Sequence, residues 1–374
     1  MKIGFDSKRA FLNNTGLGNY SRDSIRILEE YYPSNQYFLY TPIQKNNPKL
    51  NFLNGKRHLS VRSPKSYFFK LFSSLWRTFQ LTEEIVKDEV EIYHGLSHEL
   101  PKEIERTNVK TIVTIHDLIF LRFPQYYGFI DREIYRYKFY HSCRIADRII
   151  AVSEQTKSDI VEFFQIPAEK ITVVYQGCHQ MFQGSVSDDT KNNVRKKYQL
   201  PASFILSVGS VEERKNLLGI LKSLMELDRQ HLVVVGGGNT YKKSCLNFIK
   251  ENGLEERVHF LSGISTEELA AVYHLADIMI YPSLFEGFGI PIIEALFCKT
   301  PVITTRGGCF NESGGPSSLY VNPLEPDEIS DAVKLIQRDN TLRETMILDG
   351  YNYAQRFTDE KVAENLMAVY TRLR

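Results

Sequence analysis

Short apolar runs alternate along this chain with longer stretches whose apolar positions recur every three or four residues. An apolar run bounded by glycine and polar residues is typical of a strand buried on both faces of a parallel sheet, and the amphipathic stretches predict helices between the runs. Regular alternation of this kind predicts an α/β fold. The segments that carry the predicted strands are 2–6, 36–40, 91–97, 111–116, 147–153, 171–175, 204–209, 232–238, 258–263, 277–281 and 301–305.

The alternation is interrupted between residues 176 and 193. A glycine-containing turn there is followed by a polar tract at 184–193, and the strand–helix pattern restarts at Phe204. A length of 374 residues is enough for two domains that each bury their own core. We therefore place a hinge in this region and expect an N-terminal domain at 1–178 and a C-terminal domain at 179–357.

Composition narrows the class of protein. The net charge is +1, so the overall charge does not favour nucleic acid as a partner. The five cysteines are scattered without a C-x-x-C pair, which suits reduced thiols in a cytosolic protein and predicts no metal site. The first predicted strand begins at Lys2, and no apolar run reaches the length of a membrane span. We expect a soluble, cytoplasmic protein.

The densest cluster of candidate functional residues follows the strand at 277–281. A glycine-rich turn there carries Glu286, and a helix predicted to begin near Pro291 carries Glu294 in its first turn. The unpaired N–H groups and the positive end of a helix dipole suit an anion, whereas carboxylates accept hydrogen bonds from hydroxyl groups. The pattern therefore predicts a ligand that contains both phosphate and hydroxyl groups.

The string Glu286-Gly-Phe-Gly-Ile-Pro-Ile-Ile-Glu294 resembles the paired-glutamate signature of the retaining glycosyltransferases of family 4. That family has the GT-B fold, in which two Rossmann-like, doubly wound domains face an interdomain cleft. The resemblance extends over essentially the whole chain and implies that a last helix, at about 358–374, packs back on the first domain. It implies that Glu286 contacts the donor sugar and that Glu294 accepts hydrogen bonds from the ribose. The residues implied to offer backbone N–H groups nearby are Gly287, Phe288 and Gly289.

Two adjacent cations follow the strand that ends at Gly209. Arg214 and Lys215 stand near the start of a predicted helix, where they can clamp a diphosphate. Lys215 matches the lysine usual in family 4. Many relatives carry an arginine directly after the glycine, where this chain has Ser210, and the sequence leaves open whether Arg214 takes over its role.

Other candidates occur at strand ends and glycine-rich turns. His116, which ends the strand at 111–116, matches the family's histidine near the reacting sugar. Gly16 and Gly18 half-resemble a dinucleotide fingerprint that lacks its third glycine. The resemblance to family 4 implies instead a glycine-rich loop that closes over the donor phosphates and the acceptor. The residues implied to lie against the nucleotide base through backbone groups are Gly263 and Ile264.

Residues 31–82 contain no Asp or Glu but eight Lys and Arg residues. Within this segment, bulky apolar residues at 66–81 recur with helical spacing. Such a stripe suits a core-facing helix. The mixture of cations and aromatic residues equally suits peripheral contact with an anionic membrane at the inner face of the cell. Both interpretations stay open.

The resemblance implies a retaining hexosyltransferase (EC 2.4) that acts in polysaccharide biosynthesis. The donor would be a nucleotide diphosphate sugar, with mannose from GDP-mannose as the first hypothesis, and the acceptor a hydroxyl group of a glycan or lipid-linked saccharide. No Asp-x-Asp motif stands at a strand end, so we expect no metal and no cofactor. The alternatives are an epimerase or phosphorylase on the same fold, an NAD-dependent oxidoreductase and a non-catalytic nucleotide-sugar-binding protein. The incomplete glycine fingerprint disfavours the oxidoreductase, and the combination of Glu286, Lys215 and His116 disfavours the non-catalytic protein.

Overall fold

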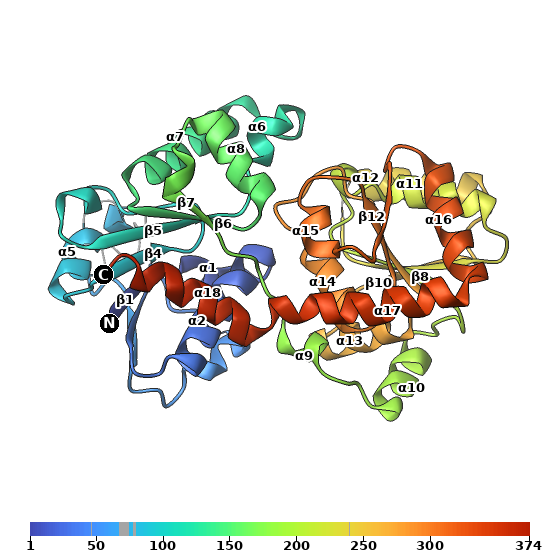
Figure 1. Ribbon diagram of the computed structural model, residues 1–374, viewed down its shortest axis with the longest axis horizontal. Helices are drawn as coiled ribbons and strands as arrows, with labels where there is room; N and C mark the ends of the chain where they lie inside the picture. The colour runs from blue at the N-terminus through green and yellow to red at the C-terminus, as the bar shows by residue number, and fades with distance from the viewer. Residues whose placement is uncertain (46, 67–74, 78–79, 239) are drawn as a thin grey trace. The chain divides into compact units, whose positions relative to one another are not determined.

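The chain forms two compact units, each built around a parallel sheet (Figure 1). The computed structural model describes residues 1–45, 47–66, 75–77, 80–238 and 240–374. Unit 1 comprises Met1–Gln176 and Asp359–Arg374, and unit 2 comprises Gly177–Thr358. The prediction of two Rossmann-like α/β domains is confirmed.

Unit 1 contains a seven-stranded sheet in the order β3-β2-β1-β4-β5-β6-β7, with every neighbouring pair parallel. The order reverses between β1 and β4, and ligands of open α/β sheets bind at the carboxyl ends of the strands at such a switch point. The strands are β1 (Lys2–Asp6), β2 (Gln36–Tyr40), β3 (Leu59–Arg62), β4 (Ile92–Gly95), β5 (Lys110–Ile115), β6 (Arg148–Ala151) and β7 (Ile171–Val173).

Helices cover both faces of this sheet because alternate side chains of its strands point to opposite faces. In β2, Tyr37 and Leu39 pack in one apolar cluster with the helices α2 and α18, whereas Phe38 and Tyr40 pack in another with α5, α6, α7 and α8. The returning C-terminal helix α18 thus contributes directly to the core of unit 1 (Figure 1). The helices of unit 1 are α1 (Lys8–Leu12), α2 (Gly16–Tyr31), α5 (Leu81–Lys87), α6 (Ile119–Arg122), α7 (Phe129–Ile145), α8 (Glu154–Phe164) and α18 (Asp359–Thr371).

Unit 2 contains a six-stranded parallel sheet in the order β10-β9-β8-β11-β12-β13, with its switch point between β8 and β11. Its strands are β8 (Phe204–Val208), β9 (His231–Val235), β10 (Val258–Leu261), β11 (Ile278–Tyr281), β12 (Val302–Thr305) and β13 (Leu319–Val321). Its helices are α9 (Gln180–Gln183), α10 (Asp188–Lys197), α11 (Leu217–Ser223), α12 (Thr240–Glu251), α13 (Thr266–Leu275), α14 (Ile290–Phe297), α15 (Phe310–Gly314), α16 (Pro326–Arg338) and α17 (Asn340–Ala354).

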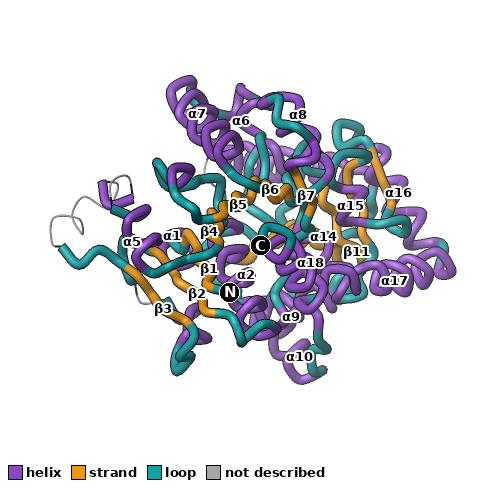
Figure 2. The backbone as a smooth tube through the Cα atoms, turned by 60° about the vertical axis from the view of Figure 1, so that its left-hand side comes forward, coloured by secondary structure: helices purple, strands orange, loops and turns teal. Residues whose placement is uncertain are grey.

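The second half of the predicted hinge tract is helical. The division between the units falls at Gly177, and residues 188–193 of the polar tract belong to the helix α10 (Figure 2). The Ser187 side chain caps this helix by accepting from the N–H of Thr190. Acids in the first turn and cations in the last turn match the helix dipole. The Ser187 cap and the charges at both ends therefore stabilise a helix in a tract whose composition alone indicated a hinge.

Gly16 and Gly18 lie in the first turn of α2 and not in a loop, and their contact with the donor phosphates and the acceptor stays a prediction. Arg22, one turn further along, is buried and donates to the carbonyls of Ala10 and Asn13 at 2.8 and 2.7 Å. A Cβ at position 18 would lie 1.9 Å from the Asn13 carbonyl oxygen. Gly18 is therefore required for close packing at the start of this helix.

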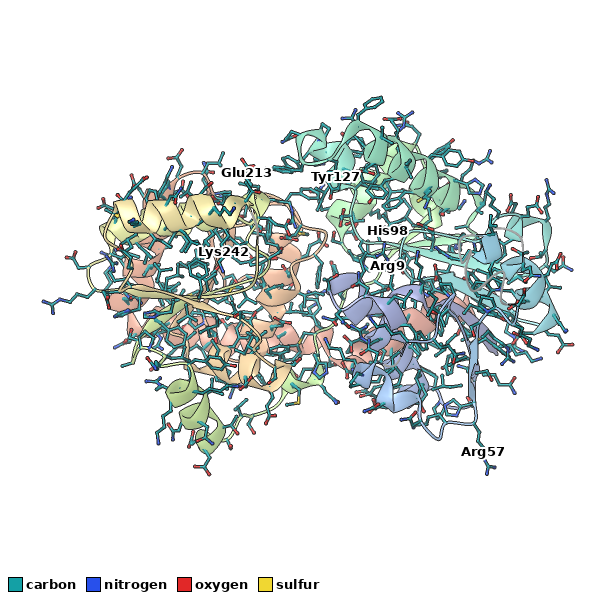
Figure 3. The ribbon with its side chains drawn as sticks, turned by 180° about the vertical axis from the view of Figure 1, so that it is seen from behind. Arg9, Arg57, His98, Tyr127, Glu213 and Lys242 are labelled. Carbon is teal, nitrogen blue, oxygen red and sulfur yellow. The ribbon has the colours of Figure 1, made fainter. Side chains whose placement is uncertain are left out.

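Three cations of the acid-free segment at 31–82 pair with carboxylates from other parts of unit 1. The pairs are Lys56–Glu29 at 2.8 Å, Arg62–Asp88 at 2.9 Å and Arg77–Asp6 at 2.6 Å. Arg57, in contrast, points away from the body of the unit (Figure 3). Most of the apolar stripe at 66–81 lies outside the described residues. Membrane contact through this segment stays a prediction for its remaining cations.

None of the helices in the described part of the chain combines the length and the hydropathy of a membrane span.

Candidate active site

The strongest candidate site lies at the switch point of unit 2, where the loops that follow β8 and β11 meet. Lys215 and Arg214 lie in the turn between β8 and α11, and Glu286 lies in the loop between β11 and α14. The two strands are neighbours in the sheet and parallel, so their carboxyl ends lie at the same edge. The structure thus brings together three of the four predicted catalytic residues.

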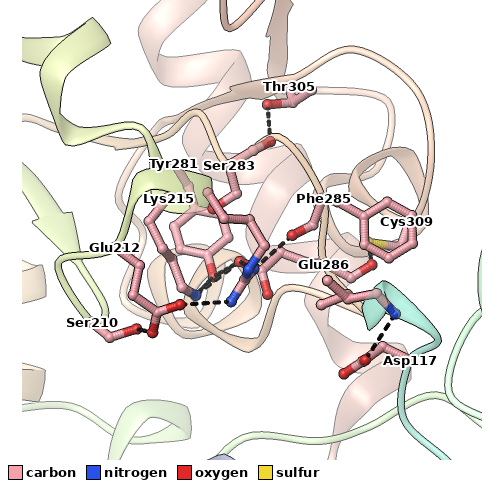
Figure 4. A network of polar contacts seen from close by, with 12 residues as sticks. Asp117, Ser210, Glu212, Lys215, Tyr281, Ser283, Phe285, Glu286, Thr305 and Cys309 are labelled. Carbon is pink, nitrogen blue, oxygen red and sulfur yellow. Dashed lines mark hydrogen bonds and ion pairs between the residues drawn. The ribbon is translucent and has the colours of Figure 1, made fainter. Parts of the chain in front are cut away.

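These residues form a compact ionic cluster (Figure 4). Arg214 Nη1 lies 2.7 Å and Lys215 Nζ 2.8 Å from the same oxygen of Glu286, Oε1. The Tyr281 hydroxyl donates to this oxygen at 2.9 Å and accepts from Lys215 Nζ at 2.5 Å. Side-chain exposure is only 12% for Glu286 and 16–17% for the two cations. The cluster is therefore mostly shielded from solvent.

The local backbone explains how the two loops are held together. Asn216 adopts the left-handed conformation, ends the turn that carries the cations and caps α11 through the N–H of Gly219. The Leu284 N–H donates to the Arg214 carbonyl at 2.8 Å, and the Arg214 guanidinium donates to the Phe285 carbonyl at 2.6 Å. Arg214 therefore braces the loop that carries Glu286 as well as pairing with its carboxylate.

The charges in the cluster keep Glu286 deprotonated and Lys215 protonated at neutral pH. Burial by itself raises the pKa of Glu286, but Lys215 and Arg214 outweigh burial and lower that pKa to about 2. Burial lowers the pKa of Lys215, and the nearby Tyr281 and Glu286 reverse this effect and raise the pKa overall. At neutral pH the Glu286 carboxylate therefore lies between two cations, and Glu212 is a second carboxylate 3.6 Å from Arg214.

Tyr281 is a site residue that we did not predict from the sequence. It is the last residue of β11, and its hydroxyl connects Lys215 to Glu286. The one signal was a hydrogen-bonding side chain at the carboxyl end of an otherwise apolar strand, the edge where ligands bind. Ser210, which stands where many relatives carry arginine, donates instead to Glu212, and Glu212 lies 3.6 Å from Arg214. Arg214, and not residue 210, thus lies beside Glu286.

The loop after Glu286 leads directly into α14. Gly289 caps this helix with φ of +102°, a conformation that side chains other than glycine rarely adopt. The Phe288 ring is buried against Phe357, with their ring centroids 5.6 Å apart. Gly287 lies between Glu286 and these packed residues. The predicted backbone contacts of this loop stay a prediction.

Glu294 lies elsewhere than predicted. It is the fifth residue of α14 and so belongs to the second turn of the helix, not the first. Its Oε2 accepts a hydrogen bond from the buried Tyr273 hydroxyl at 2.8 Å. Gly263 and Ile264 follow β10, the edge strand of the sheet, where Gly263 is exposed with φ of +67°. Ribose and base contacts for these residues stay predictions.

In unit 1, His116 is buried and both of its ring nitrogens are engaged. Nε2 lies 2.9 Å from the Leu96 carbonyl, which can only accept, and Nδ1 lies 2.9 Å from the Gln176 side-chain amide. The ring is therefore neutral with its proton on Nε2. Burial is the main cause that lowers the pKa of His116, to about 4. A neutral ring with both nitrogens occupied is not poised to act as a general base.

Two further buried histidines lie near His116. His94 hydrogen-bonds through Nδ1 to the Tyr370 hydroxyl at 2.6 Å and through Nε2 to the Thr114 hydroxyl at 2.8 Å. Burial lowers its pKa to about 3. The His98 ring stacks on Phe139 at 4.2 Å. Burial, His116 and Arg9, which Figure 3 shows beside His98, hold its pKa well below the ordinary value. All three rings are neutral in the folded protein.

These histidines predict acid lability of unit 1. A histidine whose pKa is depressed by folding does not affect stability above the unfolded pKa of 6.5, where it is neutral in both states. As the pH falls from 6.5 towards the folded pKa, the unfolded chain binds the proton more tightly, so the free energy of unfolding decreases. Each such ring contributes up to about 1.4 kcal/mol per pH unit. We expect the free energy of unfolding to fall by several kcal/mol between pH 6.5 and 5. Trp76, the sole tryptophan, is buried in unit 1, so urea unfolding followed by its fluorescence measures this quantity.

The matched variant is His98→Phe, which keeps an aromatic ring against Phe139. It should reduce the slope of stability against pH by about a third, because one of three titrating rings is removed. A stability that stays constant from pH 6.5 to 5 would show that these histidines do not titrate as their burial implies.

The chemistry available in unit 2 is electrostatic. Arg214 and Lys215 can bind a diphosphate, Glu286 and Glu294 can accept from hydroxyl groups, and Tyr281 can do both. In the described part of the chain, no three His, Cys, Asp or Glu side chains gather as a metal-ligand set requires.

Comparisons with known proteins identify the family of this chain. Residues 190–353 match the family model of group 1 glycosyl transferases, and residues 36–179 match that of glycosyltransferase family 4. The chain is 29% identical over 286 residues to O-antigen chain mannosyltransferase B of Escherichia coli, covering 75% of this chain and 74% of that protein. It is 30% identical over 227 residues to the O-antigen chain mannosyltransferase RfbU of Salmonella typhimurium, with 60% of each chain covered.

Solved structures show the same fold over nearly the full chain. HepE of Anabaena, solved in complex with UDP, has a TM-score of 0.77 at 17% identity and is matched over 100% of both chains. The sucrose-phosphate synthase of Thermosynechococcus elongatus has a TM-score of 0.79 at 19% identity, over 100% of this chain and 99% of that chain. With both halves matched by family models and a paired-glutamate loop at the switch point of unit 2, the chain belongs to glycosyltransferase family 4 and has the GT-B fold.

Proposed function

We propose that this glycosyltransferase moves mannose from GDP-mannose, with retention of anomeric configuration, to a hydroxyl group of a glycan or lipid-linked saccharide. The observation that carries the proposal is the cluster in which Glu286 holds Arg214 and Lys215 at the switch point of unit 2. Relatives named as O-antigen mannosyltransferases support mannose as the sugar. A structural neighbour solved with UDP-glucose supports a nucleotide diphosphate sugar as the kind of donor.

We assign the two cations to the donor diphosphate. A diphosphate that arrives at Arg214 and Lys215 competes with Glu286 for both of them, and its greater charge favours the exchange. As the glycosidic bond breaks, negative charge grows on the leaving phosphate, and cations already in place stabilise it without further reorganisation. Since the three contacts to Glu286 converge on Oε1, the second oxygen, Oε2, is the acceptor we assign to a hydroxyl of the donor sugar.

Retention requires no dedicated nucleophile under this proposal. The acceptor attacks from the face that the phosphate leaves, and the leaving phosphate oxygen takes the acceptor's proton. His116 keeps its proposed place near the reacting sugar as a neutral, fixed ring, because both of its nitrogens are engaged. No step calls for a metal ion, since the cations supply the positive charge.

The experiment compares nucleotide sugars by thermal shift and then by turnover. GDP-mannose should give the largest shift, because a ligand at a hundred times its dissociation constant adds about 2.7 kcal/mol to the free energy of unfolding. Incubation with GDP-mannose and saccharide acceptors should release GDP and yield an α-linked product, as NMR of the anomeric proton will show. Adding EDTA to chelate divalent ions should leave the rate unchanged.

Each alternative has its own outcome. Sugar phosphate formed only in the presence of inorganic phosphate would identify a phosphorylase, and an epimerised sugar formed without acceptor an epimerase. A thermal shift without turnover for any acceptor would favour a non-catalytic binding protein. A larger shift with UDP-sugars than with GDP-mannose would overturn the donor assignment while leaving the class of reaction intact.

A further inference from the structure

The switch point of unit 1 carries its own group of charged residues at the carboxyl ends of β1 and β4. Asp6 ends β1, and Glu99 follows β4. Arg77 donates to Asp6 at 2.6 Å and lies 3.2 Å from Glu99. Glu99 also pairs with Lys138 at 3.3 Å. Both acids of this group therefore already have cationic partners.

Two further cations at this edge have no direct counter-ion. Lys8 and Arg9 are the first two residues of α1, directly after β1, and both are partly buried. Within the part of the chain that the structure describes, neither side chain forms a hydrogen bond or an ion pair. Burial is the main cause that lowers the pKa of Lys8, and Arg77 is the next. The attraction of Asp6 and Glu99 does not cancel this effect. The surroundings of Lys8 therefore disfavour its charge as long as no further anion is bound.

His98 adds an unpaired hydrogen-bond donor to this group. The residue is only 7% exposed. Its Nδ1 accepts from the His116 backbone N–H at 3.5 Å, so the proton of the neutral ring lies on Nε2. Among the described residues Nε2 has no hydrogen-bond partner, and the chain does not enclose it. Arg9 lies beside this ring (Figure 3). Since buried polar groups are nearly always paired, this N–H indicates an acceptor that is not part of the chain.

The backbone and the packing hold the His98 ring in one orientation. His98 has φ of +67°, and its N–H donates to the Thr114 carbonyl at 3.0 Å. One face of the ring stacks on Phe139 at 4.2 Å. Gly95 permits this tight loop, because a Cβ there would lie 2.1 Å from the Glu99 carbonyl oxygen. The donor is thus preorganised, which lowers the cost of binding a ligand.

We propose that Lys8, Arg9 and His98 bind a phosphate group of the acceptor substrate. This inference rests on the proposed function and narrows the acceptor to a phosphorylated saccharide. The planar guanidinium of Arg9 matches two oxygens of a phosphate, and Lys8 adds a second charge. His98 then donates to a further oxygen. A phosphate fits three donors better than a carboxylate does, because it offers three acceptor oxygens instead of two.

The position of His98 also limits the size of the acceptor. The rings of His98 and His116 have their centroids 5.1 Å apart. Under the proposed function His116 lies near the reacting sugar. The phosphate would therefore be attached to the sugar that accepts mannose or to its neighbour. A phosphate many sugars away from the accepting hydroxyl could not reach this group.

Calorimetric titration with sodium pyrophosphate tests the binding site. Saturating GDP is present, so that the diphosphate site assigned to unit 2 is filled. Arg9→Gln and His98→Phe should each weaken pyrophosphate binding about ten-fold, because each removes a donor to a charged group. His98→Phe keeps a ring against Phe139. The matched control is Arg57→Gln, which removes the same charge from an exposed position of unit 1 and should bind like the wild type (Figure 3). Unchanged melting temperatures will show that the variants are folded.

Turnover of GDP-mannose tests the assignment to the acceptor. The KM for a saccharide 1-phosphate should be at least about ten-fold lower than that for the same saccharide without phosphate. Arg9→Gln should remove most of this difference by raising the KM for the phosphorylated saccharide, and Arg57→Gln should preserve it. The same saccharide linked through diphosphate to a short lipid distinguishes the two sources of the phosphate. A low KM for both compounds identifies a sugar phosphate, and a low KM for the lipid compound alone identifies a diphosphate linker.

Three results would overturn the inference. One is pyrophosphate affinity that is the same in Arg9→Gln and the wild type. Another is an equal KM for saccharides with and without phosphate. The third is a loss of GDP affinity in Arg9→Gln as large as the loss of pyrophosphate affinity, because Arg9 would then serve the donor. Failure of the proposed function is recognised separately: no nucleotide sugar is turned over, and the pyrophosphate titration without GDP still tests the site in unit 1.

Discussion

Replacing Glu286 with Gln is expected to lower turnover by at least about 100-fold, a change of about 2.7 kcal/mol in the activation barrier. Glu286 is the carboxylate between Arg214 and Lys215, and our proposal assigns its second oxygen to the donor sugar. Gln keeps the shape of the side chain but loses the charge. The contact to the developing transition state and the balance of the cluster are therefore lost together.

The same variant should show whether a diphosphate replaces Glu286 as the partner of Arg214 and Lys215. Without Glu286 the two cations remain shielded and unbalanced, which costs on the order of 3 kcal/mol of stability. A bound nucleoside diphosphate supplies the missing negative charge. The thermal shift caused by GDP should consequently be larger in Glu286→Gln than in the wild type, and the affinity for GDP should be retained.

The measurements are the rate of GDP release with saturating donor and acceptor, and thermal unfolding with and without GDP. Glu328→Gln is a suitable control, since Glu328 lies in α16 and pairs at 3.1 Å with the exposed Arg306. If Glu286→Gln loses stability but keeps its turnover per folded molecule, Glu286 only braces the loops. The assignment of Glu286 to the sugar would then be wrong.

Lys215→Ala is expected to weaken GDP binding about ten- to a hundred-fold. A hydrogen bond to a charged group in a shielded site contributes roughly 1.5–3 kcal/mol, and each 1.4 kcal/mol is a factor of ten in affinity. Lys215 makes side-chain contacts with Tyr281 and Glu286, whereas Arg214 also donates to the Phe285 carbonyl. Arg214→Ala should therefore lose both GDP affinity and thermal stability, and Lys215→Ala mainly affinity.

Isothermal titration calorimetry with GDP measures both effects. Lys222→Ala, which removes an exposed lysine from α11, controls for a change in overall charge and should bind GDP like the wild type. Unchanged GDP affinity in Lys215→Ala would remove this residue from the diphosphate site. A loss of affinity in Arg214→Ala that exceeds the control would show that Arg214 serves where Ser210 replaces the usual arginine.

Local pattern was sufficient to predict the central strands of both sheets. The strands at the two switch points are buried on both faces, so their apolar runs are visible in the sequence. The two strands we did not predict, β3 and β13, are edge strands and are only partly buried. An edge strand needs fewer apolar side chains, and only pairing with its neighbour decides that it is a strand.

The same distinction applies to the candidate site. The paired glutamates and adjacent cations are contiguous motifs, and the sequence was sufficient to select Glu286 and Lys215. The contacts of Tyr281 and of Glu294 to Tyr273 join residues from separate elements, so no local pattern contains them. His116 shows the limit most clearly, because its position at a strand end did not reveal the partners of its two ring nitrogens.

The sequence alone determined the order of the buried strands and the residues that end them. Buried strands appear in it as apolar runs, and helices as apolar residues that recur every three or four positions. Tertiary structure decided the hydrogen-bond partners and the protonation of those residues. Leu96 and Gln176 occupy both nitrogens of His116, and Arg22 draws the start of α2 back onto residues 10–13. Such hydrogen bonds depend on distance in space and not on spacing along the chain, so only the folded protein establishes them.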